Sequence, residues 1–138
     1  MIKQLLLPKQ TYILLRDYVL EEQNYEVCGV LSGLEGKVLN LYKVKNIATQ
    51  PEIAFYMEPQ GLYNALIAVE RSGQELLAIF HSHPSGARTD LSSSDLVGGW
   101  GYRKLLHMVV IPAATDVNIR AFDISASSPI EVPIVITA

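Results

Sequence analysis

The sequence predicts a single α+β domain, and three observations support this prediction. Apolar residues recur at intervals of three and four in two segments, which is the spacing of an amphipathic helix face. Short apolar or alternating runs between and after these segments have the length of β-strands. No internal repeat, low-complexity tract or linker interrupts the 138 residues, a length that suits one domain. We therefore expect residues 1–138 to fold as one unit.

Strands and helices are expected to alternate in the first half of the chain. The expected elements are a strand over 2–7, a helix over 9–23, a strand over 27–32, a turn over 33–36 and a strand over 37–45 with both faces covered. A short extended piece is expected over 53–57. Pro59 then begins a second helix that ends at Ser72 and Gly73. The apolar face of this helix is predicted to comprise Leu62, Ala65, Leu66 and Val69.

The second half is richer in strands. An apolar strand over 76–80 runs straight into His81, and a polar loop over 82–91 precedes a short helix that begins near Ser92. Further strands are expected over 105–111, 117–124 and 130–136, with a hairpin turn over 113–116. The pattern leaves the order and pairing of these strands open.

Composition excludes several classes of protein. Hydrophobic residues make up 49% of the chain and charged residues 18%, which is opposite to the balance of a disordered chain. The formal net charge of −3 argues against a nucleic-acid partner. No apolar run approaches the roughly 20 residues of a membrane span, so no membrane partner is expected. A single cysteine cannot form an internal disulfide, and a cytoplasmic location is the expectation.

Two histidines at the end of the predicted strand carry the clearest chemical signal. His81 and His83 are two residues apart, so on a strand their side chains point to the same face. Asp95 follows in the first turn of the next predicted helix. Two imidazoles and one carboxylate are a ligand set of catalytic zinc that leaves a position for water, whose pKa falls to about 7 on the metal.

A structural role is the alternative for the same segment. Ser92 followed three residues later by Asp95 is also a good helix N-terminus, with Ser92 as the capping residue. The two roles are compatible, because Ser92 can cap the helix while Asp95 faces an ion.

The two blocks resemble a known signature. His81-Ser82-His83-Pro84 followed by Ser92-Ser93-Ser94-Asp95 is similar to the His-x-His-Pro … Ser-x-x-Asp signature of the JAMM (MPN-plus) metallopeptidases. That family also has an upstream glutamate beside a Cys-Gly pair, which Glu26-Val27-Cys28-Gly29 matches. The resemblance, to the short prokaryotic type, implies a cytidine-deaminase-like α/β/α arrangement with a mixed β-sheet flanked by helices.

The resemblance also implies roles for these residues. One Zn²⁺ per chain would be bound by His81, His83 and Asp95. Glu26 would accept a proton from the zinc-bound water and later deliver one to the leaving amine, and Ser92 would help to stabilise the oxyanion. Without the motif, Glu26 would be interpreted as an exposed carboxylate at a helix–strand junction.

One departure from the family concerns the third ligand. Eleven residues separate His83 from Asp95, whereas the family usually has ten. Asp90 is therefore a competing ligand, although only Asp95 lies in an intact Ser-x-x-Asp sequence.

The implied activity is hydrolysis of an amide bond at the C-terminus of a ubiquitin-like or sulfur-carrier protein, by a monomer or a homodimer. Two alternatives stay open: a RadC-like member of the same superfamily with another substrate, and a non-catalytic MPN-type scaffold or binding module. A metal-sensing or storage protein would be expected to fill every coordination position with protein ligands, and only three obvious ones are present.

Three further residues are candidates for chemistry. Cys28 is a possible nucleophile, but a small buried core residue is the preferred interpretation. His107 lies in the apolar run 105–111 and is expected to be a core or interface residue. Arg88 in the polar loop could meet a substrate carboxylate, with a solvated loop residue as the alternative.

Overall fold

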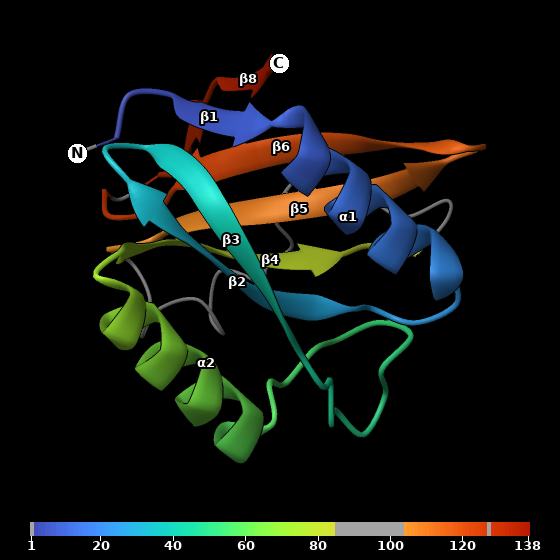
Figure 1. Cartoon of the computed structure of the whole chain (residues 1–138). Coiled ribbons are helices and arrows are strands. Elements are labelled where there is room, and N and C mark those ends of the chain that lie inside the picture. The colour runs from blue at the N-terminus through green and yellow to red at the C-terminus, as the bar shows by residue number, and fades with distance from the viewer. Residues whose placement is uncertain (1, 85–103, 127) are drawn as a thin grey trace.

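An eight-stranded sheet and two helices make up the part of the chain that the computed structural model describes, which is residues 2–84, 104–126 and 128–138 (Figure 1). In chain order the elements are β1 (Leu5–Pro8), α1 (Lys9–Glu21), β2 (Cys28–Leu34), β3 (Lys37–Val44), α2 (Pro59–Ser72), β4 (Glu75–Ser82), β5 (Leu106–Ala113), β6 (Asp116–Asp123), β7 (Ile130–Val132) and β8 (Ile134–Thr137). Neither described helix is long and apolar enough to span a membrane.

The sheet is mixed, as predicted. Its strand order is β7-β6-β5-β4-β2-β3-β1-β8. Strand β1 runs parallel to β3 and β8, and β4 runs parallel to β5, whereas the other neighbours are antiparallel. The predicted turn after β2 is present, since Glu35 and Gly36 both have positive φ (52° and 79°), as a tight hairpin requires.

The prediction of one strand over 130–136 was wrong, and the reason is Pro133. Its ring nitrogen carries no hydrogen, so it cannot donate to a strand ladder. Strand β7 pairs with β6 at one edge of the sheet, and β8 pairs with β1 at the other edge. Because only Pro133 separates β7 from β8, the two edges of the sheet meet there. The sheet is therefore curled, and Figure 1 shows the edge strand β8 beside its neighbour β1.

Helix α1 packs on the concave face of the curled sheet. Leu15 and Val19 are fully buried there, as the helical spacing predicted. The apolar cluster on this face comprises Leu5, Leu7, Leu15, Val19, Val27, Leu31, Val38, Leu77, Ala78, Phe80, Leu106, Met108, Val110, Val117 and Val132. Gly29 lets the ring of Phe80 cross β2, because a Cβ at Gly29 would lie 2.7 Å from two ring carbons.

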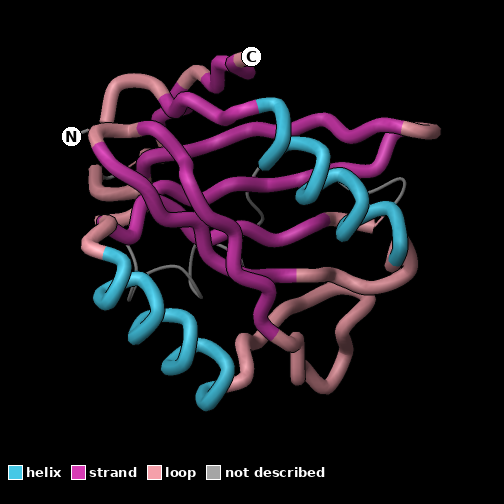
Figure 2. Tube along the Cα trace, viewed as in Figure 1, coloured by secondary structure: helices cyan, strands magenta, loops and turns pink. Residues whose placement is uncertain are grey.

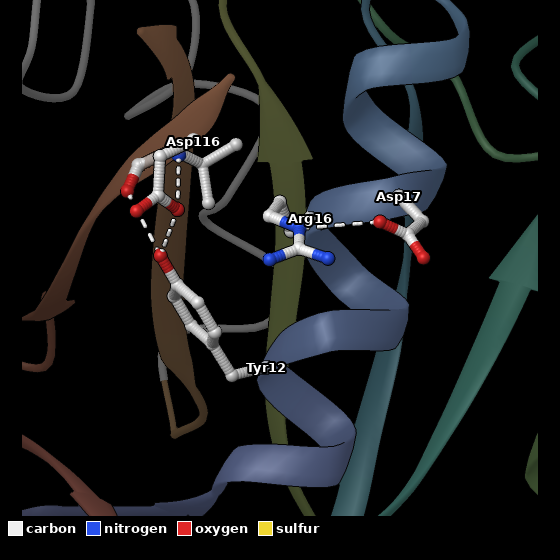
Figure 3. Close-up of polar contacts among 5 residues, drawn as sticks. Tyr12, Arg16, Asp17 and Asp116 are labelled. Carbon is white, nitrogen blue, oxygen red and sulfur yellow. Dashed lines mark hydrogen bonds and ion pairs between the residues drawn. The ribbon is translucent and has the colours of Figure 1, made fainter.

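Tyr12 fastens α1 to the β5–β6 hairpin. Its hydroxyl donates a hydrogen bond to the Asp116 carboxylate, and the carbonyl oxygen of Val117 lies 3.4 Å away (Figure 3). Arg16, on the next turn of α1, forms an exposed ion pair with Asp17 at 3.2 Å. Such an exposed pair adds little stability, and both of its residues belong to α1. The bond from Tyr12, by contrast, joins the helix to the hairpin.

Helix α2 covers part of the opposite face. Ala65 and Val69 are buried there, and the helix ends at Gly73 in the left-handed conformation (φ 74°) that glycine adopts without strain. The apolar cluster beneath α2 comprises Cys28, Val30, Val44, Met57, Ala65 and Ile79. A smaller cluster, with Val109, Ile111, Phe122 and Ile124, lies beside it on β5 and β6.

Two predictions about burial were wrong. Leu66 is 37% exposed rather than part of the buried face of α2. Leu39 is 42% exposed, so one face of β3 is open to solvent at this residue. Residues 53–57 lie in the loop between β3 and α2, which forms one isolated bridge from Asn46 to Met57 (Figure 2).

Candidate functional site

The end of β4 and the start of β2 lie side by side. In the antiparallel register, Cys28 is opposite His81. The next pair is joined twice, because the Ser82 amide donates to the Val27 carbonyl (2.9 Å) and the Val27 amide donates to the Ser82 hydroxyl oxygen (2.8 Å). Glu26 directly precedes Val27, and His83 directly follows Ser82. Since directly paired residues share a face, His81 lies on the face that carries Cys28 and α2, and the ring of His83 lies against it there.

The two histidines form a close pair. Their Nε2 atoms are 3.1 Å apart, and their side chains are 1% and 3% exposed for His81 and His83. The backbone of His83 is fixed by a hydrogen bond from its amide to the Val110 carbonyl (2.9 Å). Two nitrogens bound tetrahedrally to one zinc ion are separated by about 3.4 Å, given Zn–N distances of about 2.0–2.1 Å. The spacing of the pair therefore fits a shared metal ion, and it also suits a hydrogen bond between neutral rings.

Phe55 supports one side of this pair. Its ring stacks on the imidazole of His81 with centroids 4.5 Å apart and planes inclined by 18°. Phe55 belongs to the loop between β3 and α2, so this loop forms one wall of the site. The stacked ring restricts how the imidazole of His81 can turn.

Glu26 is held by its backbone at a point where the sheet ladder has ended. Its amide donates to the Pro51 carbonyl (2.7 Å), and its own carbonyl accepts from the Asn46 side-chain amide (2.8 Å). The side chain is 5% exposed. The predicted alternative, an exposed carboxylate at a helix–strand junction, does not describe this residue.

Cys28 is a buried residue of the apolar cluster under α2, as the preferred sequence interpretation held. Its side chain is fully buried, and the thiol donates to the Val44 carbonyl at 3.3 Å. Burial, followed by the nearby charge of Glu26, raises the pKa of the Cys28 thiol to about 12. A thiolate nucleophile is therefore disfavoured at neutral pH. His107 is also buried (2% exposed), within β5, as predicted.

The other predicted site residues lie outside the described residues. These are Ser92 and Asp95, the competing ligand Asp90, and Arg88 in the preceding loop. Within residues 2–84, 104–126 and 128–138, no three histidine, cysteine, aspartate or glutamate side chains gather as a metal-binding group. The described part of the site thus contributes two imidazoles, and the third ligand stays a prediction.

Sequence reasoning missed three residues that shape the site. Ser82 stands between the two histidines and bonds β2, Phe55 stacks on His81, and Asn46 bonds the backbone of Glu26. Asn46 had a local signal, because asparagine at the end of a strand often begins an Asx turn, and its Oδ1 accepts the Ala48 amide (2.9 Å). Phe55 and Ser82 contact segments that are distant from them in the sequence, so no local sequence pattern indicated their roles.

The sequence of this chain matches a known family. Residues 8–125 match the family described as prokaryotic homologs of the JAB domain (Prok-JAB). The chain belongs to this family. The match includes Glu26, His81 and His83 as well as the undescribed segment that holds Asp95.

Individual relatives agree with this assignment over part of their length. A desampylase from Haloferax volcanii is 36% identical over 61 residues, which is 43% of this chain and 44% of that protein. A desampylase from Pyrococcus furiosus is 37% identical over 47% of this chain and 46% of that protein. A Thermus thermophilus protein named "Probable TtuB-protein conjugate cleaving protease" is 38% identical over 51% and 47%. The chain therefore spans about half the length of the curated relatives it matches.

Solved structures share the fold at low sequence identity. A solution structure of a protein from Desulfitobacterium hafniense has a TM-score of 0.75 at 20% identity, covering 96% of this chain and 93% of that one. A JAB1/MPN domain protein from Archaeoglobus fulgidus has a TM-score of 0.59 at 16% identity, covering 96% and 98%. These likenesses establish the α+β fold across nearly the whole chain.

Proposed function

We propose that this chain is a zinc-dependent peptidase or isopeptidase that hydrolyses an amide bond at the C-terminus of a ubiquitin-like or sulfur-carrier protein. The observation that carries the proposal is the buried pair His81 and His83, with Nε2 atoms 3.1 Å apart, next to the strand end that bears Glu26. Membership in the Prok-JAB family supports a hydrolase built on this site.

His81, His83 and the predicted Asp95 would hold the metal, with Asp90 as the competing third ligand. When bound, zinc would polarise the scissile carbonyl and make hydroxide available near neutral pH. The fit rests on the spacing of the imidazole pair and on its burial, which keeps both rings in place.

Glu26 would act as the general base and then as the general acid toward the leaving amine. Two observations support this role: the side chain is 5% exposed, and its backbone is held from both sides. A carboxylate held near the reacting water needs no large movement to accept a proton. Ser92 would donate to the oxyanion, on the strength of the sequence signature alone.

The substrate class rests on the names of the relatives. Two are named desampylases and one is named for cleaving conjugates of the protein TtuB. We carry over to this chain the cleavage of a protein conjugate, and the C-terminal amide bond is the expectation from the JAMM resemblance. A cytoplasmic location, action as one domain and a monomeric or homodimeric state belong to the same proposal.

Metal content and cleavage together test the proposal. Untagged protein should contain about one zinc per chain by elemental analysis, and the His83→Ala variant should lose it. Mass spectrometry should then detect cleavage of ubiquitin-like proteins whose C-terminus is extended or conjugated. Zinc without cleavage of any such conjugate would favour a RadC-like substrate instead. Absence of zinc after reconstitution would favour the scaffold alternative.

A second pair of variants identifies the third ligand. We expect Asp95→Ala to deplete zinc and Asp90→Ala to retain it, because Ser92-x-x-Asp95 matches the signature. The reverse pattern of metal contents would assign the ligand to Asp90.

A further inference from the structure

We propose that Asn46 is a positioning residue: its side-chain amide joins the backbone of Glu26 to the loop that carries Phe55. Through these bonds it fixes Glu26 and the imidazole of His81 relative to each other. The catalytic meaning of this inference rests on the function proposed above. The geometry itself can be tested without any substrate.

The amide of Asn46 makes four hydrogen bonds, all to backbone groups. Its Nδ2 donates to the carbonyl oxygens of Glu26 (2.8 Å) and Ala54 (3.0 Å). Its Oδ1 accepts from the amides of Ala48 and Tyr56, both at 2.9 Å. These partners fix the orientation of the amide. In the reverse orientation, Nδ2 would face the two backbone N–H groups and Oδ1 would face the two carbonyl oxygens. One half-buried side chain thus uses its full hydrogen-bonding capacity to join three segments.

These bonds matter most at Glu26, because the sheet does not hold this residue. Strand β2 begins at Cys28, two residues later. The amide of Glu26 bonds to Pro51 and its carbonyl bonds to Asn46, so both backbone groups depend on the loop between β3 and α2. Losing the bond to Asn46 would leave the carbonyl of Glu26 without this anchor. The direction of its side chain would then vary.

The same loop sets the position of Phe55. Asn46 holds the residues on either side of it, through the Ala54 carbonyl and the Tyr56 amide. The Tyr56 carbonyl also accepts from the Ile47 amide (2.8 Å), which closes the loop beside Asn46. Phe55 is therefore clamped between two bonded neighbours while its ring stacks on His81. A single side chain controls the supports of both Glu26 and His81.

The Asn46→Asp variant separates the two halves of this network. Aspartate keeps the oxygen that accepts from Ala48 and Tyr56. It replaces the donor with a charged oxygen that faces the carbonyls of Glu26 and Ala54. The matched control is Asn40→Asp, the same change on β3, where the exposed side chain donates to Gln74 at 3.0 Å. Phe55→Leu removes the stacked ring and leaves Asn46 unchanged.

The test combines imidazole NMR with steady-state kinetics on the full chain. Because the Phe55 ring lies 4.5 Å from the His81 ring, it shifts the NMR signals of the His81 ring protons. The Phe55→Leu variant gives the chemical shifts of these protons without the stacked ring. We expect Asn46→Asp to move these signals towards the Phe55→Leu position and Asn40→Asp to leave them at the wild-type position. In the zinc-loaded enzyme, kcat of Asn46→Asp should fall by about ten- to a hundredfold with KM little changed.

Different outcomes overturn different statements. If the His81 signals of Asn46→Asp match the wild type, Asn46 does not position His81 and the inference is wrong. If the signals move while kcat stays at the wild-type value, the residue has only a structural role. A wild-type chain without cleavage activity would refute the proposed function, and the NMR comparison would still decide whether Asn46 holds the ring. Should Asn46→Asp not fold, Asn46→Ser removes the whole amide without adding a charge, and the same shift of the His81 signals is expected.

Discussion

The two faces of the curled sheet differ in what they bury. The concave face, under α1, buries one continuous apolar cluster that draws on β1 to β7. The opposite face divides its apolar residues between the cluster under α2 and the cluster on β5 and β6. The polar residues His81 and His83 are buried on that second face. Adjacent residues of β4 illustrate the division, because Phe80 packs in the concave core and His81 belongs to the site.

This difference shows how a small domain can bury functional groups without losing its fold. Burying polar groups is unfavourable unless they are bonded or bind a ligand. Here the apolar face supplies the driving force for folding, and the strands that it anchors carry the histidines on their other side. Changes on the concave face should therefore affect stability first, and changes on the site face should affect activity first.

Glu26→Gln should have the largest effect. We expect activity to fall by roughly a hundred- to ten-thousandfold, because glutamine cannot accept a proton at neutral pH. Zinc content and the unfolding temperature should stay close to wild type, since the base is not a proposed ligand. Elemental analysis, thermal unfolding and a cleavage assay measure the three quantities. Loss of zinc in this variant would contradict the assigned role.

Leu15→Ala tests the concave face and should give the reverse result. Leu15 is fully buried in the α1 cluster, so truncation should cost about 2–5 kcal/mol of the free energy of unfolding. Activity per folded molecule and zinc content should stay near wild type. Chemical denaturation measures the free energy of unfolding. Activity and zinc content are measured at denaturant concentrations well below the unfolding midpoint. A selective loss of zinc would mean that the two faces are not independent.

Ser82→Ala acts at the junction of the two faces. The change removes the acceptor of the buried Val27 amide and should cost about 1–3 kcal/mol. Ser32→Ala is the matched control, because Ser32 donates to Gln74 Oε1, which also receives a bond from Asn40. We expect the control to lose less stability in the same denaturation experiment. Equal losses would show that the bond to Val27 has no special importance.

Tyr12→Phe should have the smallest effect, and that effect should depend on pH. Hydrogen bonds from the Tyr12 hydroxyl and then from the Val117 amide hold the pKa of Asp116 below its usual value. A lowered folded-state pKa stabilises the protein above the unfolded pKa, and this stabilisation is lost as pH falls through the folded pKa. The unfolding temperatures of variant and wild type should therefore differ near neutral pH and converge in strong acid. Tyr63→Phe, an exposed tyrosine on α2, should show no such trend.

Local patterns in the sequence predicted a large share of the fold. The periodic apolar residues of α1, the Pro59 start and Gly73 end of α2, and the hairpin turn at Glu35 and Gly36 all agree with the structure. These features depend on a few neighbouring residues, so the sequence alone determines them. The placement of His81 and His83 on one strand face has the same origin, since alternation along a strand is local.

Only the tertiary structure decided how distant segments meet. Pro133 breaks the last apolar run locally, but no local pattern encodes the pairing of β7 and β8 at opposite edges of the sheet. Asn46 and Phe55 reach the site across a long loop, and the start of β2 lies beside the end of β4 through the register of the two strands. The sequence by itself determined which residues could perform the chemistry and which faces they occupy. Their convergence was decided by packing and strand pairing, because these interactions gain their energy from contacts between residues far apart in the chain.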